Sequence, residues 1–224
     1  MKIEHICKAP IRGLTSHTDV EVRVANKELL NFWHNQVQLP FINSMDNRLD
    51  VGWNWPNKIL LVQGTIARQL NQEPVCYTIG KKIGEGFLPL ALIFLAEKYP
   101  AVFDKQKSSS FIWYLSTAPQ DFLKLYLDEN NMPNISELCL DVGITASYIN
   151  GYNGIIGLHA LNSKKKKKAS KKLLNFYQNT CGLINLGSKE ELPPGRKIFG
   201  NDGRYFYADE KKANLIRVAN NIYR

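Results

Sequence analysis

The hydrophobic and polar positions of the first forty or so residues predict a short strand followed by an amphipathic helix. Residues 21–25 (EVRVA) alternate between charged and aliphatic side chains, as in a half-buried strand. Asn26 stands where a helix would be capped. The apolar residues after it recur at helical spacing and would share one face: Leu29, Leu30, Trp33 and Val37. Pro40 is expected to end this helix.

The next apolar stretches predict a hairpin and a buried helix. Residues 58–70 and 74–82 are β-branched and partly alternating, and the short link between them favours an antiparallel hairpin. Residues 88–98 are apolar nearly all round, with Pro89 near the first turn. We therefore expect a buried helix there.

The middle of the chain predicts a strand, a helix and a second strand. Residues 110–116 (SFIWYLS) are bulky and continuous, which is the pattern of a central strand covered on both faces. Residues 134–150 carry apolar side chains at helical spacing, and Asn134 with Glu137 resembles a capping box. An apolar strand at 155–161 follows a glycine-flanked turn. This order indicates one crossover unit of a parallel strand pair.

The last part of the chain predicts two helices with a hairpin between them. A lysine-rich helix over 165–179 ends at a Cys-Gly stop. The Gly-Asn-Asp-Gly turn within 198–207 (IFGNDGRYFY) predicts a hairpin, and a basic helix over 210–223 follows. We expect a mixed α/β (α+β) fold, with antiparallel strands first, a parallel crossover in the middle and a hairpin last.

Length and composition are those of an ordinary globular protein. Of the 224 residues, 44% are hydrophobic and 22% are charged. No apolar run approaches the ~20 residues needed to cross a bilayer, and the first residues lack a secretory signal pattern. The four cysteines are far apart, which favours reduced thiols over a metal site or a disulfide framework. We expect a cytoplasmic protein with no metal and no membrane partner.

The net charge of +9 comes largely from a lysine run. Its residues lie at 164–168, with Lys171 and Lys172 after them. Such a surface could attract nucleic acid, anionic lipid or a phosphate-bearing cofactor. The simpler interpretation, which we favour, is a solvated helix face.

The order of elements from Ser110 onward resembles the GNAT superfamily of acyl-CoA-dependent N-acyltransferases. Three stretches are similar to the family's strand, its Leu-Tyr pair and its Gly-Phe turn: GLHA (157–160), FY (176–177) and GL (182–183). Two features depart from the family. Its glycine-rich pyrophosphate loop is absent, because residues 119–134 contain no glycine and several carboxylates. The expected helix at 88–98 would also be additional to the family's elements.

The resemblance implies one GNAT-like domain over residues 1–224. An N-terminal part (1–109) would carry the helical insertion near 87–98. The acyl-CoA-binding core (110–187) would contain two parallel strands that splay apart. A C-terminal hairpin and helix (188–224) would complete the domain.

The resemblance also implies the site residues. The end of the central strand would hold the pantetheine arm of acyl-CoA through Leu115, Ser116, Thr117 and Ala118. The free N–H groups at the expected helix start would face the pyrophosphate through Asn134, Ile135 and Ser136, although the same start could be an ordinary capped helix. Tyr177 would be the general acid, since a phenol with a pKa near 10 can protonate a thiolate. A tyrosine that only packs beside Phe176 is the alternative.

The implied function is transfer of an acyl group, most simply acetyl, from acyl-CoA to an amine-bearing small molecule or protein. The general base stays open among His159, Glu85 and a water chain. Aromatic residues could line the acceptor side: Trp53, Trp55, Tyr205, Phe206 and Tyr207. Two alternatives remain. One is a GNAT-like binding or regulatory protein without catalysis, and the other is a nucleic-acid-binding protein that uses the lysine run.

Overall fold

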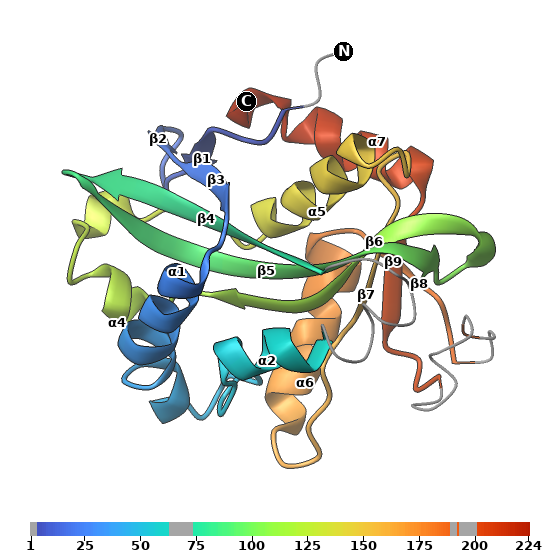
Figure 1. The fold of residues 1–224 in the computed structure, drawn as a ribbon, viewed down its shortest axis with the longest axis horizontal. Helices are drawn as coiled ribbons and strands as arrows, with labels where there is room; N and C mark the ends of the chain where they lie inside the picture. Colours follow the sequence, from blue (N-terminus) through green and yellow to red (C-terminus); the bar gives the residue numbers. More distant parts are fainter. Residues whose placement is uncertain (1–3, 63–73, 189–191, 193–200) are drawn as a thin grey trace.

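The computed structural model describes residues 4–62, 74–188, 192 and 201–224, and its centre is a seven-stranded sheet (Figure 1). The strand order is β3-β4-β5-β6-β7-β9-β8, and among the described strands only β6 and β7 run parallel. The strands are β3 (Glu21–Val24), β4 (Val75–Ile83), β5 (Gly86–Ala101), β6 (Asp104–Thr117), β7 (Ile156–His159), β8 (Ile184–Asn185) and β9 (Tyr205–Ala208). A separate two-stranded sheet pairs β1 (Lys8–Pro10) with β2 (His17–Asp19).

Helices cover both faces of the sheet. In Figure 1, α1, α2 and α6 lie on one face, and α5 and α7 lie on the other. The longer helices are α1 (Lys27–Phe32), α2 (Trp55–Val62), α5 (Leu138–Ile149), α6 (Lys167–Asn175) and α7 (Glu210–Ala219). The shorter turns are η1 (Trp33–Gln38), η2 (Ile42–Ser44), α4 (Gln120–Leu123), η4 (Glu129–Asn131), η5 (Phe176–Thr180) and η7 (Asn221–Tyr223). None of the helices in the described ranges has the length and apolar character needed to cross a membrane.

The predicted strand–helix–strand unit is confirmed as β6, α5 and β7. The helix α5 is buried from Leu138 to Ser147, and it packs on the parallel strand pair through Gly143. A Cβ atom at Gly143 would lie 3.3 Å from Ile112 and 3.6 Å from Ile156, so glycine lets the helix approach the sheet closely. The predicted helix cap is also confirmed, because the Asn26 side chain accepts a hydrogen bond from the Leu29 N–H at 2.9 Å.

The helix expected at 88–98 is wrong, because these residues form most of β5. This strand is paired along both edges, with β4 on one side and β6 on the other. Residues 90–96 are at most 2% exposed. A strand that is buried on both faces needs no polar alternation, so its pattern cannot be distinguished from that of a buried helix. No helical insertion therefore interrupts residues 87–98.

The hairpin expected from 58–70 and 74–82 is only half correct. Residues 74–82 match β4, but its hairpin partner is β5, through the turn at Gly84. Residues 55–62 form α2 instead, whose start is capped by the Asn54 side chain through the Asn57 N–H at 3.1 Å. Residues 63–70 lie outside the described part of the chain.

The C-terminal elements are partly as expected. The helix over 210–223 is confirmed as α7 and η7, and Asp209 caps it. The strand after the Gly-Asn-Asp-Gly turn is confirmed as β9, which lies between β7 and β8. Its two edges are therefore paired with β7 and β8, both antiparallel to it. The other half of the expected hairpin lies outside the described residues.

Cys76, buried in β4, leads to a prediction on pH dependence. Burial raises the pKa of its thiol from 9.0 to about 12. The unfolded chain loses this proton near pH 9 and the folded chain keeps it, so the stabilisation is complete below pH 9 and is lost as the pH rises towards 12. Between pH 8 and pH 10, this thiol should lower the free energy of unfolding by about 1.4 kcal/mol.

Urea unfolding at pH 8 and pH 10 checks this prediction. The Cys76→Ala variant should lose less stability between the two pH values than the parent protein, by about that 1.4 kcal/mol. Cys7→Ala, which removes an exposed thiol, is the matched control. Equal losses in the parent and in Cys76→Ala would contradict the assignment.

Candidate functional site

The parallel strands β6 and β7 separate and leave a cavity between them. Within the described residues they pair at three positions, Ser110 with Ile156, Phe111 with Gly157 and Ile112 with Leu158. β7 ends at His159, whereas β6 continues to Thr117. A cavity of about 620 Å³ lies where they part, with walls from β6, β7, α6 and the loop before α2.

The end of β6 turns its backbone groups towards this cavity. The Ala118 N–H donates to the Leu90 carbonyl of β5 at 2.8 Å. In an antiparallel ladder, alternate residues bond to the same neighbour, so Ser116 also faces β5 while Leu115 and Thr117 face away from it. A β-bulge lies just before this stretch, where Tyr114 is opposite Phe94 and Ile112 is opposite Leu95. Such a bulge bends the strand.

Of the four expected pantetheine contacts, three line the cavity: Leu115, Ser116 and Thr117. Of these three, Leu115 and Thr117 have their backbone groups on the side away from β5. Ala118 does not line it, and its N–H is already used by Leu90.

The expected helix start at Asn134 is wrong, because α5 begins at Leu138 with Glu137 at its cap position. The Asn134 N–H donates to the Pro10 carbonyl at 2.7 Å, and Pro133 forms a β-bridge with Ile11. This pairing with the N-terminal segment keeps residues 133–134 extended. The three expected pyrophosphate residues are consequently not brought together. Ser136 lines the cavity, Ile135 is buried, and Asn134 lines a separate smaller hollow.

Tyr177 lies in the wall of the cavity, at the end of the α6 segment. It belongs to the π-helical turn η5 and is 7% exposed. Its ring packs near Phe176 and Phe206, with centroid distances of 5.4 and 5.9 Å. Burial raises the pKa of its phenol well above the ordinary value of 10, and the charged forms of Cys181, Cys139 and Asp50 add to the shift. The hydroxyl therefore stays protonated at neutral pH.

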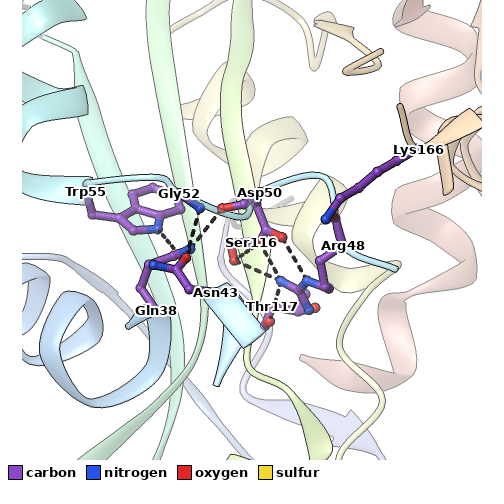
Figure 2. Close-up of polar contacts among 9 residues, drawn as sticks. All are labelled: Gln38, Asn43, Arg48, Asp50, Gly52, Trp55, Ser116, Thr117 and Lys166. Carbon is purple, nitrogen blue, oxygen red and sulfur yellow. Dashed lines mark hydrogen bonds and ion pairs between the residues drawn. The ribbon is translucent and has the colours of Figure 1, made fainter. Parts of the chain in front are cut away.

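An ion pair in the cavity wall, Arg48 with Asp50, was not expected from the sequence (Figure 2). The Arg48 Nε donates to Asp50 Oδ1 at 2.8 Å, and its Nη2 donates to the Thr117 carbonyl at 3.0 Å. Asp50 Oδ2 accepts a hydrogen bond from the Ser116 hydroxyl at 2.6 Å. These residues come from a polar loop and a strand more than sixty positions apart, so no local pattern signals the contact.

The loop that carries Arg48 is held from both sides, as Figure 2 shows. The fully buried Gln38 donates to the Asp50 carbonyl at 2.8 Å and to the Asn43 side chain at 2.9 Å. Lys166, just before α6, donates to the Arg48 carbonyl at 3.1 Å. Of the lysines between 164 and 172, Lys166 therefore holds the loop of Arg48, and Lys172 lines the cavity.

The two candidate bases lie in different places. His159 lines the cavity, and its Nε2 lies 3.1 Å from Asp202 Oδ1. Glu85 is exposed in the β4–β5 turn and is not among the residues that line the cavity. Of the aromatic residues considered for the acceptor side, Trp53 and Tyr205 line the cavity, and Trp55 is buried behind Trp53.

Comparison with known proteins identifies the fold. No protein-family model matches the sequence, and no curated protein is similar to it in sequence. Apo FdhC, a nucleotide-linked sugar GNAT, matches with a TM-score of 0.51 at 10% identity, over 91% of this chain and 94% of FdhC. Two further matches have lower scores. A spermidine N-acetyltransferase from Vibrio cholerae, in complex with CoA and spermine, has a TM-score of 0.48 at 14% identity, over 87% of this chain and 98% of the enzyme. A mutant AtaT toxin, bound to the C-terminus of the antitoxin AtaR and acetyl-CoA, has a TM-score of 0.41 at 14% identity, over 89% and 98%.

The fold of this chain is therefore that of the GNAT proteins, as the order of its elements predicted. Because these sequence identities are low, the similarity is evidence for the fold alone.

Proposed function

We propose that this GNAT-fold chain is an acyl-CoA-dependent N-acyltransferase, with acetyl-CoA as the simplest acyl donor. One observation supports this most directly. The cavity between β6 and β7 is lined both by backbone groups that face away from β5 and by a buried tyrosine. An acyl transfer to an amine needs a held thioester and a proton for the departing thiolate, and these two features can supply them.

The end of β6 would hold the thioester. The backbone groups of Leu115 and Thr117 face the cavity, so the pantetheine arm can pair with them as an added strand would. A backbone N–H there can also donate to the thioester oxygen as negative charge develops on it. One such donor is typically worth about 3–4 kcal/mol of barrier.

Tyr177 would be the general acid. The amine nitrogen forms a bond to the thioester carbon, the C–S bond breaks, and the leaving sulfur takes the Tyr177 proton. The proton lost by the amine returns to the phenolate through water. A raised pKa makes the phenol a weaker acid, but desolvation in the same cavity raises the pKa of the leaving thiol as well.

The acceptor would be an amine-bearing small molecule or protein. The loop before α2 would form one side of its site, with Trp53 and Asp50 in the cavity wall. The amine must be neutral to attack, so a proton must leave it first. Water or His159, which lines the same cavity, could accept that proton.

Titration with acetyl-CoA tests the proposal. At 1 mM ligand, a complex with a Kd of 10 μM would be stabilised by RT ln(1 + 100), about 2.7 kcal/mol, which a thermal melt detects. ATP at the same concentration is the control for non-specific attraction of an anionic nucleotide to a chain of net charge +9. Release of free thiol with a panel of amines then measures turnover.

Each outcome has a clear meaning. Stabilisation by acetyl-CoA, but not by ATP, with amine-dependent thiol release supports the transferase. Stabilisation without release favours the alternative of a binding protein with this fold. Equal effects of acetyl-CoA and ATP contradict the proposal.

A further inference from the structure

The Arg48 side chain occupies the edge of β6 that the proposed function assigns to the pantetheine arm. Thr117 faces away from β5, and its carbonyl accepts the Arg48 Nη2 bond at 3.0 Å (Figure 2). A second observation agrees with this direction. The Ala91 carbonyl, opposite Thr117 in the register, accepts from Thr78 of β4 at 2.9 Å, so it has a partner on the side of β4.

Arg48 is held on this edge by groups other than Thr117. Its guanidinium pairs with both oxygens of Asp50, and it donates to the Ser116 hydroxyl at 3.1 Å. The Asp50 side chain is 8% exposed, and the Arg48 side chain is 20% exposed. Asp50, which also accepts from Ser116, is therefore the fixed partner, and Arg48 lies nearer to the solvent.

A ligand that pairs with β6 as an added strand needs the Thr117 carbonyl for one of its own N–H groups. The guanidinium stands in the path of that ligand, and the two cannot both lie against Thr117. We infer that Arg48 is a latch on the acyl-donor site: its bond to Thr117 must break before acyl-CoA can pair with β6, and Asp50 sets how firmly it is closed. This inference rests on the proposed function.

The latch makes an uncommon prediction, because removing a positive charge should tighten the binding of an anionic ligand. In Arg48→Met, a side chain of similar length remains but the donors are lost. We expect the Kd for acetyl-CoA, measured by isothermal titration calorimetry, to fall about tenfold, the value of one hydrogen bond to a charged group. Arg23→Met, which removes an exposed guanidinium from β3, is the matched control and should leave the Kd unchanged.

A second variant guards against misfolding. Asp50→Asn keeps an acceptor for the Ser116 hydroxyl but releases the ion pair, so it should lower the Kd in the same direction by a smaller factor. Circular dichroism melts report whether each variant is folded. If Arg48→Met does not fold, the Kd of Asp50→Asn is used to test the inference.

The outcomes separate the latch from the function on which it rests. If the parent binds acetyl-CoA and the folded variants bind it equally or more weakly, the latch is wrong and the proposed function stands. If the parent does not bind but Arg48→Met does, the latch is supported in its strongest form. If neither binds, the proposed function fails and the latch fails with it.

Discussion

Replacing Arg224 by alanine is expected to lower the free energy of unfolding by about 3–5 kcal/mol. The reason is Asp141, a carboxylate on α5 that is 0% exposed. Arg224 Nη2 lies 2.6 Å from Asp141 Oδ2, and the arginine side chain is itself only 10% exposed. Removing the guanidinium would leave a buried charge without its close partner.

The hydrogen bonds from Thr145 and Asn220 are too long to replace that partner. The contacts from Thr145 and Asn220 to Asp141 are both 3.5 Å long, at the limit of a hydrogen bond. Arg217 is also nearby, and its Nη1 donates to the Thr145 hydroxyl at 3.2 Å. Urea unfolding measures the loss.

Two controls make this result specific. Asp141→Asn combined with Arg224→Ala removes both charges and should be more stable than Arg224→Ala alone. The exposed pair of Lys107 and Glu210, with side chains 45% and 46% exposed, provides a matched ion pair. Its disruption by Lys107→Ala should cost less than ~1 kcal/mol. A loss as small as this in Arg224→Ala would contradict the argument.

Replacing Tyr177 by phenylalanine is expected to lower kcat about 10²–10⁴-fold while the protein stays folded. Phenylalanine keeps the ring contacts with Phe176 and Phe206 and removes only the hydroxyl. KM for acetyl-CoA should change little, because the proton is needed after binding. Steady-state kinetics of thiol release measure both constants.

Tyr126→Phe is the matched control, since this tyrosine is 46% exposed and is not among the residues that line the cavity. It should keep the parent kcat. If Tyr177→Phe has the same kcat as the parent, Tyr177 is not the general acid. It would then be a tyrosine that only packs beside Phe176, which is the alternative given in the sequence analysis.

The elements that the sequence predicted correctly are those set by local patterns. The cap at Asn26, the burial of one face after it and the order β6, α5, β7 all follow from spacing along a short stretch. That order, together with the stretches at 157–160, 176–177 and 182–183, carried the resemblance to the GNAT superfamily. Tyr177 was singled out by its place near the end of the lysine-rich helix together with the GNAT resemblance, and its role as general acid stays a prediction.

The errors come from contacts between distant parts of the chain. Residues 88–98 lack an alternating pattern because both faces of β5 are buried, on one side by the distant helix α5. The start of α5 is displaced because Pro10, far away in sequence, takes the Asn134 N–H. Arg48 and Thr117 are 69 positions apart in the sequence, so no local pattern predicts the hydrogen bond between them.

The burial of β5 has a consequence for the nascent chain. Residues 90–96 (LALIFLA) carry no charge and no proline, and in the folded protein they are at most 2% exposed. Before β4 and β6 have docked, this segment is an open template for cross-β association between molecules. Since β6 follows β5 in the chain, synthesis must proceed past residue 117 before both edges can be shielded, and until then one edge of this segment stays open to association with other molecules.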